Sequence, residues 1–416
     1  MIGPGAPEGH LRKKAALALL LCGCSVAHVE EPTSSTGGSG TTTASTSGTT
    51  GGGYDAAPHP AWPQIPSGSG KVMDAPVLQV ITFDTLANGT DPYPFQAEME
   101  SFGAWLVTSS WLGPVGNEYG VHSASADPPV RLGTTPPGYV ADSDVRNMLA
   151  SLIQAGTVPP PPANDQRLYM FFFPADTGLF LDNGAQACTD FEGYHFDTTI
   201  TVNGQDVDVP YAVIPDCNIT STGISEPQQL EAAASHELIE AATDPSPSQT
   251  PAYILNDDSS PWTLTGGELG DVCANDYLRD QATNFVVQRS WSNTLAKGDG
   301  SPCAPAPDPT TKPFLGVAAT VTGRLTADAG DTLDVPLVAW SNAPHGPWAL
   351  KSLLITGTFD PQATTTPDYV GNGDTGKLTL TIPPNAQSGQ QALVWVFTPQ
   401  TADTDSEWWP VVVQVR

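Results

Sequence analysis

One helical segment constrains this chain more than any other feature, because its two ends are clearly marked. Ser225 and Gln228 fit a capping box, and Pro227 suits a first helical turn, where its missing N–H costs nothing. Asp244 precedes Pro245, and a residue before proline is pushed out of the helical conformation. Alanines recur between these ends, so the segment predicts a thin helix that packs closely in a core.

The same helix carries charged residues at a metal-binding spacing. His236 and Glu240 lie one turn apart on one face, and Glu237 follows the histidine. The pattern is that of a zinc-peptidase helix, His-Glu-x-x-His, with the last His replaced by Glu. It predicts zinc held by His236 and Glu240, with Glu237 as the catalytic base acting on the metal-bound water. The alternative is a solvated helix face, where such charges commonly occur.

Further ligands are expected in other segments of the chain. Glu268, in the Gly-framed stretch 266–273, is the predicted third ligand. Asp271 is either a ligand or an acceptor for the ring N–H of His236. His195 is a rival ligand or a catalytic residue that stabilises the transition state.

Several segments together resemble one known family. They are His236–Glu240 with Pro245, Glu268–Cys273, Val287–Ser292, Cys188–His195 and Tyr211–Val213. As a set they resemble the plant exordium, or phosphate-induced-protein-1, proteins and their bacterial relatives, over about residues 76 to 305. The resemblance implies a secreted or wall-associated protein with a shared His, Glu and Asp cluster. It implies no particular enzymatic activity.

The N-terminus has the features of an export signal. Basic residues at 12–14 precede the apolar run 15–21, which is too short to span a bilayer. The following Leu-Cys-Gly-Cys resembles a bacterial lipobox, which predicts a signal peptide over 1–23 and lipidation of Cys24, with Cys22 as the weaker alternative. An ordinary secretory signal is the other interpretation.

The cysteines indicate the compartment in which the chain resides, and the net charge narrows the kinds of molecule that it binds. Apart from Cys22 and Cys24, the chain has Cys188, Cys217, Cys273 and Cys303. An even number in an exported chain predicts disulfides, and of the three possible pairings we expect the sequence neighbours to pair. The formal net charge of −29 disfavours nucleic acid as a partner.

The composition changes along the chain and predicts its division. Residues 24–70 are rich in Ser, Thr and Gly and predict a disordered tether, and 304–313 form a Pro-rich linker. Residues 71–303 contain apolar runs at 77–83, 168–173 and 209–215 and helical patterns at 95–106 and 145–155. We therefore expect an α+β (or α/β) zincin-like main domain over 71–303. Alternating short strands over 314–416 predict an all-β immunoglobulin-like sandwich as an accessory domain.

Two classes of function fit these patterns. The first is an exported lipoprotein, anchored in the outer membrane or at the cell surface, with a zinc-dependent, metallopeptidase-like hydrolase site for an extracellular peptide. The alternative is a non-catalytic surface protein that acts in adhesion or in binding, with polysaccharide as a candidate ligand and with structural calcium or no metal. A secreted form is the alternative to anchoring. Hydrolysis of glycosides by a carboxylate pair is a third, weaker idea. The sandwich tryptophans Trp340, Trp348, Trp395, Trp408 and Trp409 fit either a carbohydrate-binding face or core packing.

Overall fold

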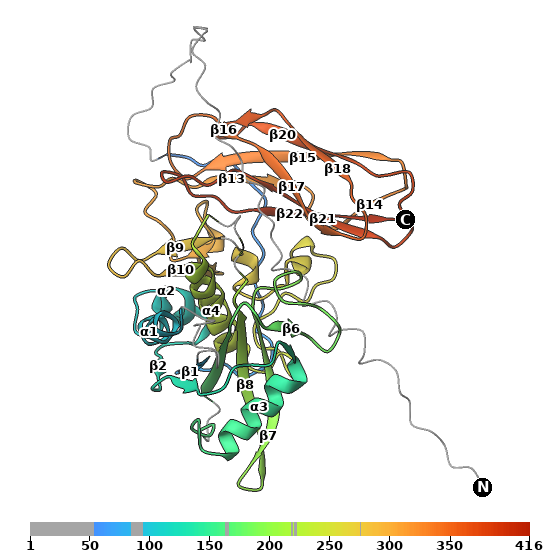
Figure 1. Cartoon of the computed structure of the whole chain (residues 1–416). Coiled ribbons are helices and arrows are strands. Elements are labelled where there is room, and N and C mark those ends of the chain that lie inside the picture. Colours follow the sequence, from blue (N-terminus) through green and yellow to red (C-terminus); the bar gives the residue numbers. More distant parts are fainter. Residues whose placement is uncertain (1–53, 85–94, 163–165, 218, 220–222, 275) are drawn as a thin grey trace, which may run out of the picture.

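The computed structural model describes residues 54–84, 95–162, 166–217, 219, 223–274 and 276–416 of the chain. Two strand-rich regions lie one above the other in Figure 1. The lower region contains a six-stranded sheet with helices, and the upper region contains two four-stranded sheets.

The six-stranded sheet has the order β2-β1-β5-β8-β7, and β3 also pairs with β1. All pairings are parallel except the β7–β8 hairpin. The strands are β1 (Val77–Phe83), β2 (Ser125–Ala126), β3 (Val130–Leu132), β5 (Arg167–Phe173), β7 (Tyr194–Val202) and β8 (Gln205–Pro215). The apolar runs of β1 and β5 are almost entirely buried, as expected for central parallel strands covered on both faces.

Helices cover both faces of this sheet. Helices α1 (Gln96–Leu106), α2 (Leu112–Gly116) and α4 (Glu226–Thr243) share one core with one face, and α3 (Asp142–Gln154) shares another core with the opposite face. Successive residues of β5 alternate between the two cores, because side chains of a strand point to opposite faces. Short 3₁₀ turns span Asn117–Tyr119, Pro261–Thr265, Asp271–Cys273 and Leu295–Lys297.

Several predicted elements are confirmed. β1 spans the predicted residues 77–83, and α1 and α3 lie within a few residues of their predicted bounds. Helix α4 begins after Ser225, where Gln228 Oε1 accepts a hydrogen bond from the Ser225 N–H at 3.1 Å, and it ends before Asp244. The local end signals were therefore sufficient to place this helix.

The predicted zincin-like fold class is wrong. Strands make up 34% of the structure and helices only 18%, and there are many small sheets rather than a helix-rich α+β domain. Segments without clear periodicity form two-stranded sheets: β4 (Tyr139–Ala141) with β6 (Gly178–Phe180), β9 (Tyr277–Arg279) with β10 (Val286–Gln288), and β11 (Ser290–Trp291) with β12 (Cys303–Ala304). Such pairs of two to three residues leave no sequence period long enough to recognise.

The C-terminal region is a pair of four-stranded sheets around a shared apolar core. One sheet contains β13 (Leu315–Ala319), β15 (Thr332–Ser341), β20 (Thr375–Thr381) and β18 (Gln362–Thr366). The other contains β14 (Leu325–Ala327), β22 (Trp409–Val415), β21 (Gln391–Phe397) and β17 (Lys351–Gly357), and a small pair joins β16 (Trp348–Ala349) to β19 (Tyr369–Val370). We call this region the sandwich.

The sandwich tryptophans pack in the interior. Trp340, Trp348, Trp395 and Trp409 are buried, and Trp408 is half-buried and stacks on Phe397. Core packing, rather than a carbohydrate-binding face, is therefore the use that the structure gives to these side chains.

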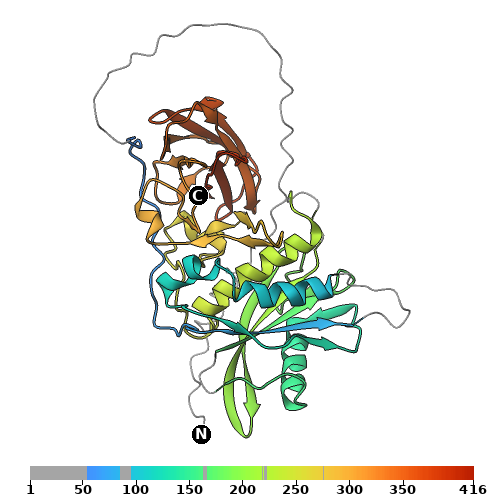
Figure 2. The same cartoon turned by 90° about the vertical axis from the view of Figure 1, so that its left-hand side faces the viewer.

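Residues 54–70, which composition assigns to the tether, pack along both regions; we call them the strap. Figure 2 shows the strap in blue, running from the sandwich down to the N-terminal sheet. Tyr54 hydrogen-bonds Ser341 at 2.6 Å in the sandwich. Further on, the side-chain amide of Asn293 bonds both the N–H and the C=O of Ile65, each at 2.8 Å. The strap therefore bridges the two regions.

Trp62 anchors the strap in an aromatic cluster. The centroid of its ring lies 5.1 Å from that of Trp409 and 5.7 Å from that of Trp340, both in the sandwich. The ring centroid of Trp262, in the N-terminal region, lies 5.8 Å away. At 3% exposure it is a core residue of both regions at once. These aromatic contacts therefore make the strap part of the folded core.

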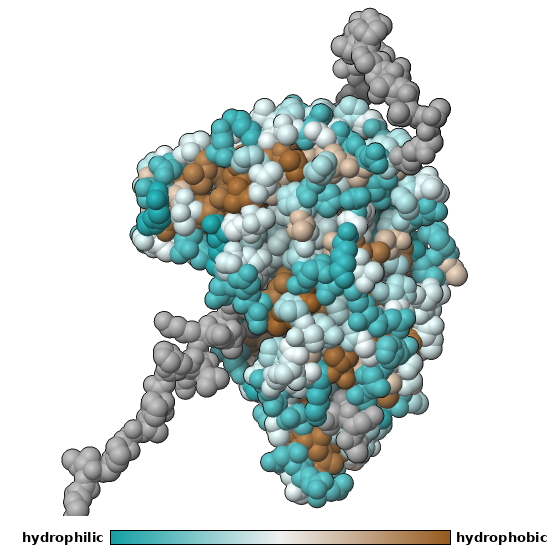
Figure 3. All heavy atoms as spheres, turned by 180° about the vertical axis from the view of Figure 1, so that it is seen from behind, coloured by the Kyte–Doolittle hydropathy of each residue, from teal (hydrophilic) through white to brown (hydrophobic). Residues whose placement is uncertain are grey.

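The signal peptide predicted over 1–23 and the lipidation site Cys24 lie outside the described residues. Within the described ranges, no helix combines the length and apolar character needed to cross a bilayer. The face seen in Figure 3 is largely hydrophilic, and its apolar residues gather in separate patches.

We predict that Trp62→Ala destabilises the whole chain. Removing a buried tryptophan costs about 3–5 kcal/mol, because its contacts are lost and a cavity remains. Tyr369→Ala, which truncates an aromatic side chain that is 60% exposed, is the matched control. Urea unfolding measures both variants, and equal stability of the two would show that the strap contributes little.

A second prediction concerns Glu231, a buried carboxyl of α4 whose Oε2 accepts a hydrogen bond from the Val286 N–H at 2.7 Å. Burial raises its pKa to about 8. The folded protein thus keeps a proton that the unfolded chain loses near pH 4.5, and stability falls as pH rises towards 8. Glu231→Gln should remove this fall, so its stability relative to wild type should grow between pH 5 and pH 8. Parallel pH profiles would contradict the prediction, and Glu226→Gln at the start of α4 is the control.

Candidate metal centre

Helix α4 carries its charged residues into the interior. His236, Glu237 and Glu240 are 7%, 4% and 3% exposed, so they do not form a solvated helix face. Ionised groups in such surroundings are normally paired or bound to a metal. The burial therefore favours a binding or catalytic role for these residues over a solvated helix face.

The structure brings all six predicted site residues together. His195 comes from β7, Glu268 from the loop before the 3₁₀ turn Asp271–Cys273, and Asp271 from the start of that turn. His236 Nε2 lies 3.1 Å from Glu240 Oε2 and 3.8 Å from Asp271 Oδ1. His195 Nδ1 lies 3.2 Å from Glu237 Oε2, and its Nε2 lies 4.0 Å from Glu268 Oε2. We refer to these six residues as the cluster.

The ring of His236 is held in one orientation by Gln288. Gln288 Nε2 donates to the Gly270 carbonyl at 2.7 Å, which leaves its Oε1 facing His236 Nδ1 at 3.1 Å. An amide oxygen only accepts, so Nδ1 carries the proton of that bond. Nε2 of His236 is then the nitrogen that faces the carboxylates. This is how a second contact prepares a histidine to bind a metal through its other nitrogen.

His195 is oriented in the same way. Its Nε2 lies 3.2 Å from the backbone carbonyl of Asp244, which can only accept a hydrogen bond. Its Nδ1 therefore faces Glu237 Oε2 at 3.2 Å and Glu240 Oε2 at 3.7 Å. Both histidines thus donate outward to a neutral oxygen and turn their second nitrogen towards Glu237 and Glu240.

Backbone amides hold the central carboxylate in place. Glu240 Oε1 accepts hydrogen bonds from the N–H groups of Gly270 and Asp271, both at 3.0 Å. Burial alone would raise the pKa of Glu240, but the charges and the hydrogen bond of the two histidines, His236 first, lower it to about 2. Glu240 is therefore the ionised centre of the cluster.

The outer carboxyls behave in the opposite way. Burial, followed by the negative charge of Glu240, raises the pKa of Glu268 and of Asp271 well above the ordinary range. For His236, burial lowers the pKa, but Glu240 and Glu237 outweigh burial and raise it well above the ordinary value. In the absence of a cation, the cluster would have to take up protons to limit its buried charge.

Three contributors were missed by sequence reasoning. Gln288 lies in the Val-Gln-x-x-Trp-Ser segment that carries the family resemblance, and that segment was the available signal. Glu192 lies near His236, and burial raises its pKa to about 7 against the opposing charge of that histidine. A Cβ added to Gly193 would lie 2.7 Å from Glu237 Oε1, so this glycine makes room for the glutamate.

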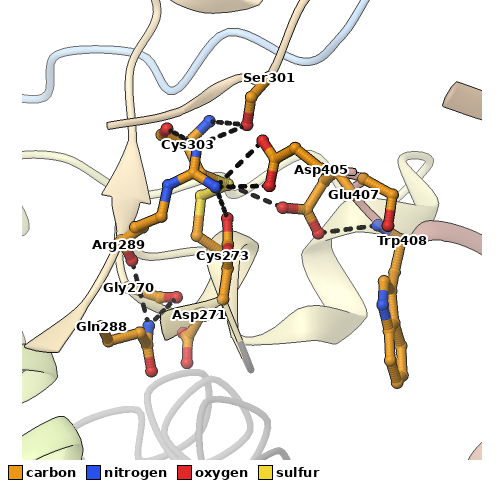
Figure 4. Close-up of a disulfide and its surroundings, with 12 residues drawn as sticks. Gly270, Asp271, Cys273, Gln288, Arg289, Ser301, Cys303, Asp405, Glu407 and Trp408 are labelled. Atoms are coloured by element: carbon orange, nitrogen blue, oxygen red, sulfur yellow. Dashed lines mark hydrogen bonds and ion pairs between the residues drawn. A yellow bond between two sulfur atoms is a disulfide. The ribbon is translucent and has the colours of Figure 1, made fainter. Parts of the chain in front are cut away.

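Both predicted disulfides are present, Cys188–Cys217 and Cys273–Cys303. They indicate an oxidising environment outside the cytoplasm. Cys273 ends the turn that begins with Asp271, so its bond to Cys303 ties the cluster loop to β12. Figure 4 shows this disulfide next to Arg289.

Two neighbouring residues connect the cluster to the sandwich. In Figure 4, Gln288 points towards Gly270, whereas Arg289 points towards Asp405. Arg289 Nη1 lies 2.7 Å from Asp276 Oδ2 and 2.9 Å from Asp405 Oδ1, and all three side chains are buried. A buried ion pair of this kind requires both regions to be in place, because losing either partner leaves a buried charge.

A third acid reaches the disulfide itself. Glu407 Oε2 lies 2.7 Å from Cys303 Sγ. Burial first, then the charge of Asp276, raises the pKa of Glu407 well above its ordinary value.

Comparisons with known proteins give no family. No family model matches the chain, and no curated protein matches it. The resemblance to exordium proteins therefore stays a prediction.

Among solved structures, domains 4 and 5 of the S-layer protein SbsC are 11% identical, cover 25% of this chain and 53% of their own, and have a TM-score of 0.19. The PapD-like domain 7 of human CEP192 is 14% identical, covers 29% and 94%, and has a TM-score of 0.17. A nucleoside hydrolase-related hypothetical protein from Saccharophagus degradans is 10% identical, covers 73% and 78%, and has a TM-score of 0.23. TM-scores this low support no conclusion about function.

We predict that Gly270→Ala disrupts the cluster by steric overlap. A Cβ at this position would lie 2.7 Å from His236 Nδ1 and 2.8 Å from Glu240 Oε1, and hydrogen bonds hold both groups in place. Overpacking of this kind costs about 1–3 kcal/mol. Gly133→Ala, whose Cβ would meet nothing within 4 Å, is the control in the same thermal unfolding experiment. Equal melting temperatures for the two variants would mean that the cluster is loosely held.

Proposed function

We propose that this chain is an exported cell-surface protein whose N-terminal region is stabilised by a buried transition-metal centre, with zinc as the metal. The observation that carries the proposal is the orientation of the two histidines. His195 Nδ1 and His236 Nε2 face the same two carboxylates, and the other nitrogen of each ring is engaged by a neutral oxygen. Two such nitrogens beside carboxylates are donors that zinc accepts.

The nitrogen donors argue for the class of metal. Calcium takes oxygen ligands only, and its site would leave both histidines out. Imidazole together with carboxylate suits zinc and the neighbouring transition metals. A cation at this position would also replace the protons that His236, Glu268 and Asp271 otherwise have to hold.

A stabilising centre fits the geometry better than a hydrolytic one. The side chains of His195, Glu237, Glu240 and His236 are 4%, 5%, 4% and 8% exposed, which leaves little room for a polymeric substrate. Glu237, the expected catalytic base, lies against His195, with Oε2 3.2 Å from Nδ1. We therefore favour a non-catalytic surface protein over a zinc metallopeptidase-like hydrolase.

The surface location is supported by the two disulfides and by the export signal that the sequence predicts. We propose lipidation of Cys24 as the link to the membrane and an extracellular peptide or polysaccharide as the ligand. The net charge of −29 disfavours nucleic acid as a partner.

The test is metal content of the chain from residue 25 onward, exported behind a cleavable signal peptide and measured by mass spectrometry after mild purification. We expect stoichiometric zinc in the wild type and its loss in His236→Ala, because that variant removes a ligand. His345→Ala, which changes an exposed histidine of the sandwich, is the control and should keep the metal. Absence of bound metal from the wild type would refute the proposed centre.

The hydrolytic alternative has its own readout. If the purified protein cleaves peptides, and if Glu237→Gln abolishes cleavage while keeping the metal, the non-catalytic proposal is wrong and Glu237 is a catalytic base.

A further inference from the structure

We infer that the cluster holds two divalent transition-metal ions bridged by carboxylates. This inference rests on the proposed function, namely that the cluster binds metal at all. It goes further in assigning the number of ions, the ligands of each ion and the residues that the ions share.

The first argument is the position of Glu237 and Glu240 between the two rings. Glu237 Oε2 lies 3.2 Å from His195 Nδ1, and its other oxygen, Oε1, lies 4.0 Å from His236 Nε2. Glu240 Oε2 lies 3.1 Å from His236 Nε2 and 3.7 Å from His195 Nδ1. Each carboxylate thus faces both histidines. Glu237 faces them with different oxygens and is placed to bridge two ions through its two oxygens. Glu240 faces both rings with Oε2 alone, because its Oε1 accepts backbone hydrogen bonds, and would bridge through that single oxygen.

The second argument is that the remaining acids divide between the rings. Glu268 Oε2 lies 4.0 Å from the ring of His195, and Asp271 Oδ1 lies 3.8 Å from that of His236. The cluster also contains two complete sets of three donors, each with its ligand atoms within 4.8 Å of one another. One set is His195, Glu240 and Glu268, the other is His236, Glu237 and Glu240, and Glu240 belongs to both. Each ion would therefore have one histidine and one terminal acid of its own.

The third argument is charge. The four carboxyls of the cluster, Glu237, Glu240, Glu268 and Asp271, carry four negative charges when ionised, and the two neutral imidazoles carry none. One divalent ion would leave two negative charges in a buried site, where uncompensated charge is costly. Two divalent ions balance the four carboxylates.

The coordination number of zinc also indicates two ions in the cluster. A four-coordinate zinc would use four of the six donor side chains and leave two acids without a cation. Metal ions of two-metal sites lie about 3.5–4 Å apart, so one carboxylate can reach both. Two histidines with four acids also form the donor set of carboxylate-bridged dinuclear centres built in helix bundles. Zinc, manganese(II) and iron(II) all suit these donors.

The experiment is reconstitution of the metal-free chain, from residue 25 onward, with Zn²⁺ and separately with Mn²⁺. We expect two ions per chain by mass spectrometry. We also expect an electron paramagnetic resonance spectrum of exchange-coupled manganese, because bridging carboxylates couple the two ions.

The possible results separate the two proposals. One ion per chain, with the spectrum of isolated manganese, would overturn the dinuclear inference and leave the proposed metal centre intact. No bound ion of either metal would overturn both. Two uncoupled ions would place the second ion outside the cluster and would also overturn the inference.

Variants assign the two ions to their ligands. Glu268→Gln should weaken the ion beside His195, and Asp271→Asn the ion beside His236, so each should lower the stoichiometry towards one and remove the coupling. Glu231→Gln, a buried carboxyl of α4 outside the cluster, is the control and should keep two ions. If both cluster variants still bind two coupled ions, the ligand assignment is wrong. Circular dichroism of each metal-free variant shows whether it has folded.

Discussion

The structure depends on one constraint, the burial of several titratable side chains on and around helix α4. His236, Glu237 and Glu240 cannot turn to solvent, because apolar residues of the same helix pack against the sheet. Other segments must therefore compensate them. β7 contributes His195, the 266–273 loop contributes amides and acids, and β10 contributes Gln288. The positions of these segments follow from the requirement that each buried polar group has a partner.

This requirement explains why backbone N–H and C=O groups form hydrogen bonds with the side chains of the cluster. Gly270 allows its own amide to reach Glu240, since any Cβ would meet the histidine ring. Asp244 contributes its carbonyl to His195 at the point where α4 ends and that group has no helical partner. The helix end and the loop therefore serve as hydrogen-bonding partners, and the Cys273–Cys303 disulfide keeps that loop close.

The sequence predicts local features well and distant ones poorly. The ends of α4 and the strand β1 are set by neighbouring residues, so their positions were readable. The candidate residues of the cluster were chosen from their chemistry, but their convergence in space could not be read from the sequence. Gln288 was missed because a lone amide in a three-residue strand has no pattern. Trp62 was missed because a single aromatic residue in a Ser- and Gly-rich stretch hardly changes the average composition. The zincin-like fold class failed for a similar reason, since short strand pairs leave no period.

The strap has a consequence for the order in which the protein matures. Its Trp62 is synthesised early, whereas Trp340 and Trp409, which enclose it, are among the last segments made. Domains generally fold from the N-terminus as the chain emerges. Here the strap must wait, with the indole of Trp62 in water, until the strands of the sandwich arrive. Completion of the fold is thus a closing step, and a chain cut short during synthesis would keep this aromatic residue exposed to quality control.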